Sequence, residues 1–247
     1  MRIGIFDSGI GGLTVLKELI TKYPYNQYFY FGDNTHMPYG SKSREELKQL
    51  SQNNIEFLLS KNVDMIIIAC GTVSANLGPY LKKKYEIPIY DVISPTIKFL
   101  NNSSFSKIGL LATEMTIKSK IFDKAKKEIV GVPCPLLVPL IESDEDATTV
   151  LQDYLKKLPK DIDALVLGCT HYPVLKEEIK RKLPEISIIN MGQVLCDDLN
   201  IISGKEIKIR LYFGEVNHKL IENIDRIIKK DYQLEEIYAG VTRSRNS

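Results

Sequence analysis

Two cysteines stand in matched positions and could act together on one small molecule. Cys70 and Cys169 each end an apolar run that begins with an aspartate six positions earlier, and each is followed within two residues by a threonine, Thr72 or Thr170. A free thiol has a pKa of about 8.5, so a modest shift makes both thiol and thiolate accessible near neutral pH. Two thiols facing one carbon could remove a proton from one face and deliver a proton to the other. That general acid–base chemistry inverts a stereocentre.

Other roles for these cysteines remain open. A cysteine after an apolar strand is often a small buried hydrophobe, and Cys70, Cys169 and His171 could form part of a zinc site. The sequence contains no CxxC pair, which disfavours a metal site and a redox pair. Cys134 and Cys196 lack such threonine neighbours and are interpreted as structural. The sequence predicts no metal and no cofactor, because no pyridoxal, flavin or nicotinamide signature is evident.

The loop DSGIGGLT holds Asp7 and Ser8 directly after the first apolar run. Its glycines suggest a nucleotide loop, but the dinucleotide pattern requires glycine where Thr14 stands, and no P-loop lysine follows. We interpret the loop as a tight turn whose backbone amides open a helix, an arrangement that favours a carboxylate or phosphate. Asp7 is either a cap of this turn or, if it faces a cysteine, an assistant in acid–base chemistry.

Further candidates follow other apolar runs. Tyr39 and Gly40 lie in the loop MPYG, and Glu142 ends an apolar run before the acidic stretch SDEDA. Glu142 is therefore either a solvated acid or a catalytic one. His171 lies two positions after Cys169, and an imidazole can set the protonation of a neighbouring thiol. These positions suit a ligand site, because open parallel sheets bind ligands at the carboxyl ends of their strands.

Apolar runs alternate with amphipathic stretches along the chain, which predicts an α/β protein with parallel sheets covered on both faces. Ser43 and Glu46 form a capping-box pattern at the start of the second helix. Strands are predicted at 2–6, 28–33, 64–70, 87–93, 107–113, 135–142, 163–169, 187–191 and 206–213. Helices are predicted at 13–23, 43–61, 74–85, 119–129, 147–158 and 173–183.

A faint internal repeat suggests two similar halves. DMIIIACGT resembles DALVLGCTH, and RIGIFDS resembles KIGLLAT, at similar offsets along the chain. The alternative is that all buried parallel strands look alike. The polar stretch 94–107 is interpreted as the crossover between the halves, and the last apolar run, 206–213, as a return to the first half. The basic and polar tail, 241–247, is predicted to fray.

Composition excludes several classes of partner. The 247 residues include 33 basic and 31 acidic side chains and carry a net charge of +2, which gives no electrostatic reason to expect nucleic acid or a membrane surface. No apolar run approaches the ~18 residues that span a bilayer. The N-terminus lacks the apolar stretch of a signal peptide, which predicts a cytoplasmic protein with free thiols.

Five motifs together resemble those of the glutamate racemase family. They occur in the order and approximate spacing of that family and cover nearly the whole chain: FDSGIGG (6–12), YFGDNTHMPYG (30–40), ACGTVSA (69–75), VPLIE (138–142) and GCTHYP (168–173). The resemblance implies two similar α/β domains with mainly parallel sheets and an active site in the cleft between them. It also implies cofactor-independent interconversion of L- and D-glutamate, with D-glutamate used for peptidoglycan biosynthesis and so for cell-wall biogenesis and cell shape.

The resemblance also assigns domains and residues. The first domain would comprise 1–93 plus 208–247 and the second 94–207, in a protein that forms a homodimer. Cys70 and Cys169 would be the two proton donors and acceptors, with Asp7 assisting Cys70, and Glu142 and His171 assisting Cys169. The substrate-binding positions would be Asp7, Ser8, Tyr39, Gly40, Gly71, Thr72, Thr116, Thr170 and His171.

Two positions depart from the family pattern. Gly71 stands where the family usually has asparagine, and Ser94 stands where glutamate is expected. The loss of one hydrogen bond to a charged group costs roughly 1.5–3 kcal/mol unless water or a neighbour substitutes. Two alternatives therefore stay open: a racemase for aspartate or a related amino acid, and a glutamate-binding homologue whose turnover is reduced because of Gly71.

Overall fold

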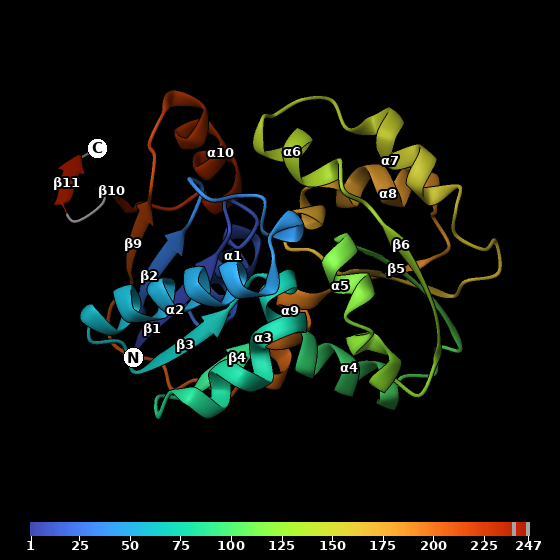
Figure 1. Ribbon diagram of the computed structural model, residues 1–247, viewed down its shortest axis with the longest axis horizontal. Helices are drawn as coiled ribbons and strands as arrows, with labels where there is room; N and C mark the ends of the chain where they lie inside the picture. Colours follow the sequence, from blue (N-terminus) through green and yellow to red (C-terminus); the bar gives the residue numbers. More distant parts are fainter. Residues whose placement is uncertain (239–240, 246–247) are drawn as a thin grey trace.

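The computed structural model describes residues 1–238 and 241–245 and contains two sheets (Figure 1). The first sheet has the strand order β11-β10-β9-β2-β1-β3-β4, and the second has the order β6-β5-β7-β8. All strand pairs in both sheets are parallel except β10 and β11. The strands of the first sheet are β1 (Arg2–Asp7), β2 (Gln27–Gly32), β3 (Met65–Ile68), β4 (Ile89–Asp91), β9 (Lys208–Phe213), β10 (Gln233–Tyr238) and β11 (Val241–Arg245). Those of the second are β5 (Lys107–Ala112), β6 (Glu128–Pro133), β7 (Ala164–Leu167) and β8 (Ser187–Asn190).

Helices connect the strands and cover the sheets. They are α1 (Leu13–Lys22), α2 (Arg44–Ser60), α3 (Gly71–Lys84), α4 (Ile93–Asn102), α5 (Glu114–Lys118), α6 (Leu137–Glu142), α7 (Thr148–Leu155), α8 (Lys176–Lys182), α9 (Met191–Asp198) and α10 (His218–Ile228). Three single 3₁₀ turns are added at Tyr39–Ser41, Ile121–Lys124 and Tyr172–Leu175. The predicted capping box is present at α2, where Glu46 N donates to Ser43 Oγ and Ser43 N donates to Glu46 Oε2.

The two sheets repeat one topology. The order β2-β1-β3-β4 in the first half corresponds to β6-β5-β7-β8 in the second. Within this correspondence β1 matches β5 and β3 matches β7, which are the pairs that the sequence similarity suggested. The predicted α/β class with two mainly parallel sheets is confirmed, and β9 joins the first sheet beside β2 as expected. Cys70 follows β3 and Cys169 follows β7, so the two thiols occupy equivalent strand ends.

Two segments of the second half were predicted with the wrong structure. Residues 135–142 form a turn and helix α6 (Leu137–Glu142) rather than a strand. The buried Leu137, Val138 and Ile141 lie on one helical face, and a short apolar run fits either structure. Residues 119–129 do not form one helix. Lys120 adopts a left-handed conformation with φ 55°, which ends the helical path, and a 3₁₀ turn and strand β6 follow.

The stretch 94–107 is the crossover between the halves, as interpreted, because it connects β4 of the first sheet to β5 of the second. Most of it is helix α4, whose Pro95 lies in the first turn, where the missing N–H is not needed. Helix α3 begins at Gly71, immediately after Cys70, rather than at residue 74. In the tail, 241–245 pair with β10 as strand β11, so the prediction of fraying is wrong there, and 246–247 lie outside the described residues.

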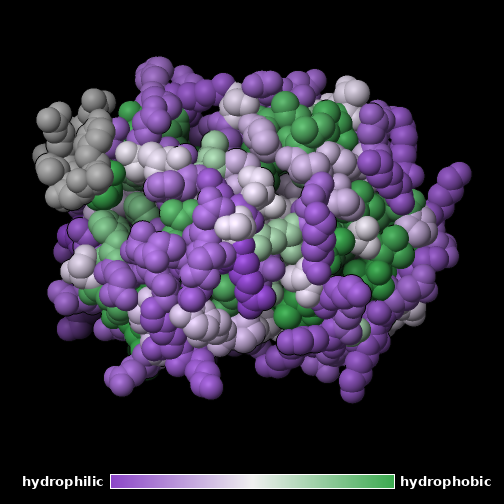
Figure 2. All heavy atoms as spheres, in the orientation of Figure 1, coloured by the Kyte–Doolittle hydropathy of each residue, from purple (hydrophilic) through white to green (hydrophobic). Residues whose placement is uncertain are grey.

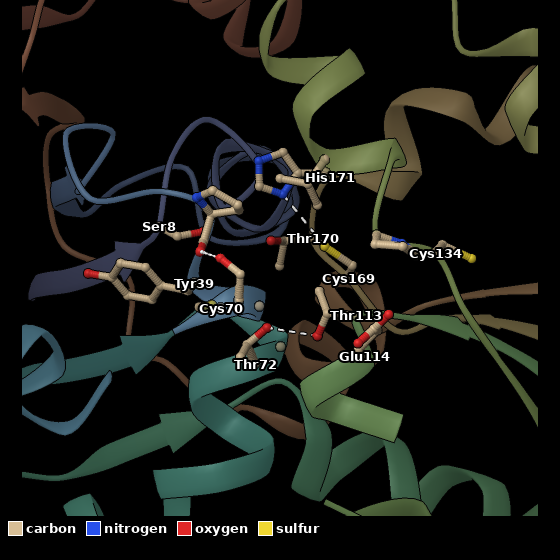
Figure 3. A pocket seen from close by; sticks show the side chains of 16 residues that line it. Ser8, Tyr39, Cys70, Thr72, Thr113, Glu114, Cys134, Cys169, Thr170 and His171 are labelled. Atoms are coloured by element: carbon tan, nitrogen blue, oxygen red, sulfur yellow. Dashed lines mark hydrogen bonds between the residues drawn. The ribbon is translucent and has the colours of Figure 1, made fainter. Parts of the chain in front are cut away.

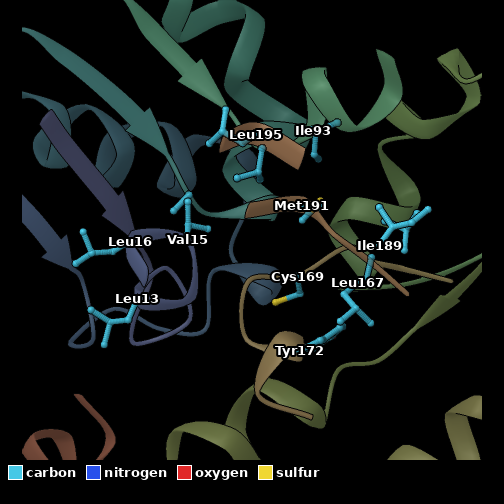
Figure 4. Packing of buried hydrophobic residues seen from close by; sticks show 14 of the residues in the cluster. Leu13, Val15, Leu16, Ile93, Leu167, Cys169, Tyr172, Ile189, Met191 and Leu195 are labelled. Carbon is cyan, nitrogen blue, oxygen red and sulfur yellow. The ribbon is translucent and has the colours of Figure 1, made fainter. Parts of the chain in front are cut away.

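One apolar cluster joins the two halves. Helix α9 packs against α1 of the first half and against α4, with Leu13, Val15 and Leu16 on one side and Met191 and Leu195 on the other (Figure 4). The surface shown in Figure 2 is mostly hydrophilic, with smaller apolar areas. Within the described residues, no helix has the length and apolar character needed to span a membrane. The shared core holds the carboxyl ends of β1, β3, β5 and β7 at one place.

Candidate active site

A pocket of about 260 Å³ lies where the strand ends of the two halves meet (Figure 3). Most of the predicted site residues line it: Ser8, Tyr39, Gly40, Cys70, Gly71, Thr72, Cys169, Thr170 and His171. Asp7, Glu142 and Thr116 do not reach the pocket wall and lie behind it. The remaining lining residues were not predicted from the sequence: Pro38, Ser41, Thr113, Glu114, Cys134, Pro135 and Val138. Both cysteines of the predicted pair therefore open onto one cavity, each from its own half.

The first thiol belongs to the residue that precedes helix α3. Cys70 is the N-cap of this helix, so the free N–H groups of its first turn lie close to the thiol. Burial raises the pKa of Cys70, and the negative charge of Asp7 raises it further, against smaller opposing effects of the backbone N–H groups of Val73 and Thr72. In the resting protein Cys70 is therefore a protonated thiol, suited to donate a proton.

The second thiol faces a histidine. Cys169 Sγ lies 3.6 Å from His171 Nδ1, and His171 Nε2 lies 2.6 Å from Glu142 Oε1. Burial disfavours the imidazolium, but the hydrogen bonds and negative charges of Cys169 and Glu142 outweigh burial and raise the pKa of His171 well above its ordinary value. A charged imidazole within hydrogen-bond distance stabilises a thiolate. This side of the pocket thus places a sulfur atom and an imidazole within hydrogen-bond distance of each other.

Glu142 supports that histidine from the end of helix α6. Its Oε1 also accepts a hydrogen bond of 2.8 Å from Ile10 N, in the turn after β1. The side chains of Glu142 and His171 are only 6% and 2% exposed, so their charges are not dispersed by solvent. Glu142 is therefore neither at a strand end nor in a solvated acidic loop. It joins the second half to the first through the helix that replaces the predicted strand.

Asp7 lies behind the pocket, on the side of Cys70. Its carboxylate accepts hydrogen bonds from Gly9 N at 3.2 Å and from Thr170 Oγ1 at 3.1 Å. Burial raises the pKa of Asp7, opposed in part by the charge of His171. The bond to Thr170 crosses between the halves, so Asp7 both influences Cys70 and holds the residue beside Cys169.

Hydrogen-bonded threonine hydroxyls connect the two halves at the pocket wall. Thr72 Oγ1 lies 3.0 Å from Thr113 Oγ1, and Thr113 Oγ1 donates to Thr116 Oγ1 at 3.0 Å. Thr116, predicted as a ligand of the substrate, is one hydrogen bond behind Thr113, which is the residue on the pocket wall. A signal for Thr113 existed in the sequence, because it follows β5 as Ser8 follows β1, the equivalent strand.

Tyr39 contributes its ring rather than its hydroxyl to the pocket. The hydroxyl donates to Asp33 Oδ2 at 2.5 Å and accepts from Asn54 Nδ2 at 2.9 Å. In Figure 3 it points away from the two cysteines. Burial and the neighbouring Asp33 raise the pKa of Tyr39, so it stays neutral. The ring forms a fixed wall beside the cavity and helps to exclude water.

The described residues that line the pocket include no lysine and no arginine. Its polar lining consists of hydroxyls, backbone groups and the first turn of α3, which favour an anion, together with the imidazole of His171 and the carboxyl group of Glu114. Among the described residues, no group of three or more His, Cys, Asp or Glu side chains is placed to hold a metal ion. What the pocket can do chemically rests on the two thiols and the groups behind them.

Comparison with known proteins agrees with this geometry. The Asp/Glu/hydantoin racemase family model matches residues 13–199. Glutamate racemase from Carboxydothermus hydrogenoformans is 42% identical over 99% of this chain and 94% of its own, and that from Aquifex aeolicus is 38% identical over 93% of each. The chain belongs to the Asp/Glu/hydantoin racemase family. Its activity is that of an amino-acid racemase, an isomerase.

Solved structures show the same fold. Glutamate racemase isoform RacE1 from Bacillus anthracis superposes with a TM-score of 0.89 at 29% identity, over 97% of this chain and 98% of that one. Glutamate racemase from Francisella tularensis in complex with D-glutamate gives a TM-score of 0.83 at 32% identity, over 96% and 97% of the two chains. The two-sheet arrangement around the pocket is thus shared with glutamate racemases.

Proposed function

We propose that this chain is a cofactor-independent glutamate racemase that interconverts L- and D-glutamate with Cys70 and Cys169 as the two bases. The single observation that carries the proposal is that both thiols, at equivalent strand ends of the two halves, line one pocket. The names of the relatives support glutamate as the substrate, and the Francisella tularensis relative is described in complex with D-glutamate.

The reaction needs one thiolate and one thiol at a time. A thiolate removes the α-proton, the electron pair of the Cα–H bond remains on Cα, and the opposite thiol donates its proton to the other face. The protonation states of the two cysteines are then exchanged, which prepares the enzyme for the reverse direction. In one direction the protonated Cys70 serves as the acid and Cys169, whose Sγ lies 3.6 Å from His171 Nδ1, serves as the base.

The groups behind the thiols tune and stabilise this exchange. Asp7 assists Cys70, and the His171–Glu142 pair assists Cys169. The carbanionic charge that develops on the substrate is stabilised by the first turn of α3 and by hydroxyls, in a site from which water is largely excluded.

A dicarboxylate substrate fits the hydroxyls and backbone N–H groups of the lining, beside the imidazole of His171. The carboxylates of glutamate would accept hydrogen bonds from Ser8, Thr72, Thr170 and backbone N–H groups, including that of Gly71. Thr113 joins this set because it reaches the wall where Thr116 does not. The remaining candidates are a racemase for aspartate and a binding protein with reduced turnover.

The wider role is part of the same proposal. D-Glutamate made by this enzyme would supply peptidoglycan biosynthesis in the cytoplasm, and the protein would act as a homodimer. The proposed domains are 1–93 plus 208–247 and 94–207. Light scattering of the purified protein measures the oligomeric state directly, and a monomeric mass under assay conditions would contradict the homodimer.

Deuterium exchange is the test of the reaction. The purified protein is incubated in deuterium oxide with L-glutamate, D-glutamate, L-aspartate or D-aspartate, and both α-deuterium content and enantiomer ratio are followed. We expect glutamate to gain α-deuterium while it racemises. Exchange of aspartate but not glutamate would replace the substrate, and binding of glutamate without exchange would support the binding protein. Activity unchanged by exhaustive chelation would exclude a required metal.

A further inference from the structure

The two thiol-bearing turns touch each other through their main chains. A Cβ atom placed on Gly71 would lie 2.6 Å from the backbone oxygen of Gly168, where ordinary van der Waals contact begins near 3.4 Å. Gly71 directly follows Cys70, and Gly168 directly precedes Cys169. The contact therefore joins the two cysteine turns at the positions next to their thiols, across the boundary between the two sheets.

Position 71 requires glycine because the main chain of Gly168 lies so close to it. Gly71 is the first residue of helix α3, and its φ lies outside the left-handed region, so any residue could adopt this backbone conformation. A side chain here would meet main chain rather than the end of a flexible side chain, and rotation cannot relieve such a clash. The restriction comes from the opposite turn alone.

Neither turn can move aside on its own. Ala69 N donates to Phe6 O at 3.0 Å within the first sheet, and Gly168 N donates to Leu111 O at 2.7 Å within the second. Each turn is thus fixed to its own sheet by a backbone hydrogen bond next to its cysteine. A larger residue at position 71 would be accommodated by moving the two halves apart. That motion leaves the bonds within each sheet intact and strains those between the halves, such as the bond from Thr170 Oγ1 to Asp7.

We infer that Gly71 is a positioning residue that sets the separation of the two thiols by letting the cysteine turns meet main chain to main chain. This inference rests on the proposed two-thiol function and deepens it. The absence of an amide side chain at position 71 is then not a lost substrate contact. It is the condition for a closely spaced acid and base, and a shift of reacting groups by about 1 Å can cost roughly 100-fold in rate.

Two substitutions separate spacing from substrate contact. Gly71→Ala adds only a Cβ, and Gly71→Asn adds the amide that the family usually has. If spacing matters, both lower kcat by about 100-fold and change KM much less. Gly78→Ala is the matched control in the same helix, because its Cβ would lie 3.7 Å from the Asp91 carboxylate, in ordinary contact, and we expect normal kcat.

A half-reaction makes the result independent of how much protein is folded. With β-chloroglutamate, one thiolate removes the α-proton, the Cα–H electron pair forms the Cα=Cβ bond, and chloride leaves with its own electron pair. The resulting enamine is hydrolysed to a keto acid and ammonia. Elimination needs one thiol, whereas inversion of glutamate needs both, so the ratio of elimination to inversion should rise in Gly71→Ala. An unfolded fraction contributes to neither rate and leaves this ratio unchanged.

The following results would show whether Gly71 sets the separation of the thiols. Wild-type kcat and an unchanged ratio in Gly71→Ala would overturn the inference, and so would a lower KM with undiminished kcat in Gly71→Asn, which would identify a missing contact instead. The failure of the proposed function looks different. In that case the wild type would not racemise glutamate, or the Cys70→Ser and Cys169→Ser variants would racemise it normally.

Discussion

The two halves of the molecule share a strand order but surround their thiols differently. Cys70 lies beside a buried carboxylate, Asp7, and at the start of a helix. Cys169 lies beside an imidazole that is held by Glu142. Equivalent strand ends thus place a carboxylate near the thiol in the first half and an imidazole beside the thiol in the second. The repeat supplies matched positions, and the neighbours of the two thiols differ in charge.

The different surroundings of the two thiols do not favour one direction of catalysis over the other. The two enantiomers of glutamate have equal free energy, so the equilibrium constant for their interconversion is one and kcat/KM must be equal in both directions. An asymmetric site can therefore give the two directions different kcat values only if their KM values differ by the same factor. Irreversible half-reactions are not bound by this equality, and they report each side of the pocket separately.

The largest expected effect comes from removing either thiol. Cys70→Ser and Cys169→Ser should each reduce racemisation by roughly 10³-fold, because a serine hydroxyl is a far weaker acid and cannot replace a thiol in proton transfer. Each variant should retain elimination from the one enantiomer of β-chloroglutamate whose α-proton faces the remaining cysteine. Measurement of inversion and elimination for both enantiomers separates the two thiols.

A third cysteine serves as the control. Cys196 is buried in α9, away from the pocket lining, and Cys196→Ser should racemise at the wild-type rate once the folded fraction is accounted for. Normal racemisation by both pocket variants would disprove the two-thiol mechanism. Loss of elimination from the same enantiomer in both variants would show that the cysteines do not face opposite sides of the substrate.

The sequence predicted the thiol pair because both cysteines follow short strands that are buried on both faces and read as continuous apolar runs. The prediction of a strand was wrong for 135–142, because a short apolar run can also form a helix, and this one contains α6. The hydrogen bond between Thr72 and Thr113 and the contact of Gly71 with Gly168 could not be predicted, since both depend on how closely the halves approach. That approach follows from packing around α9, which no local pattern encodes.

Substitution of the groups behind the thiols should have intermediate effects, and each substitution should slow the reaction of one enantiomer only. Asp7→Asn should slow elimination from the enantiomer handled by Cys70, because asparagine cannot accept a proton from the thiol as the Asp7 carboxylate can. His171→Asn should slow elimination from the enantiomer handled by Cys169, and each loss should be about 100-fold. The charge of Asp7 raises the pKa of Cys70, so its removal lowers that pKa. Alkylation of Cys70 by iodoacetamide, followed by mass spectrometry, should then begin at lower pH in Asp7→Asn than in the wild type. Equal slowing of both enantiomers by both variants would contradict the division of the site into two sides.

The smallest effect is expected at Glu142, which acts on Cys169 only through His171. Glu142→Gln keeps the shape and can still hydrogen-bond the imidazole, but it removes a negative charge that raises the pKa of His171. That pKa therefore falls, and the imidazolium is lost at lower pH. The alkaline limb of kcat against pH should move toward acid, with about a tenfold loss in kcat where the imidazolium is no longer present. Because Glu142 does not line the pocket, KM should change little.

An unmoved alkaline limb in Glu142→Gln would mean that the charge of His171 does not govern Cys169. The contrast between the two thiols would then rest on Asp7 alone.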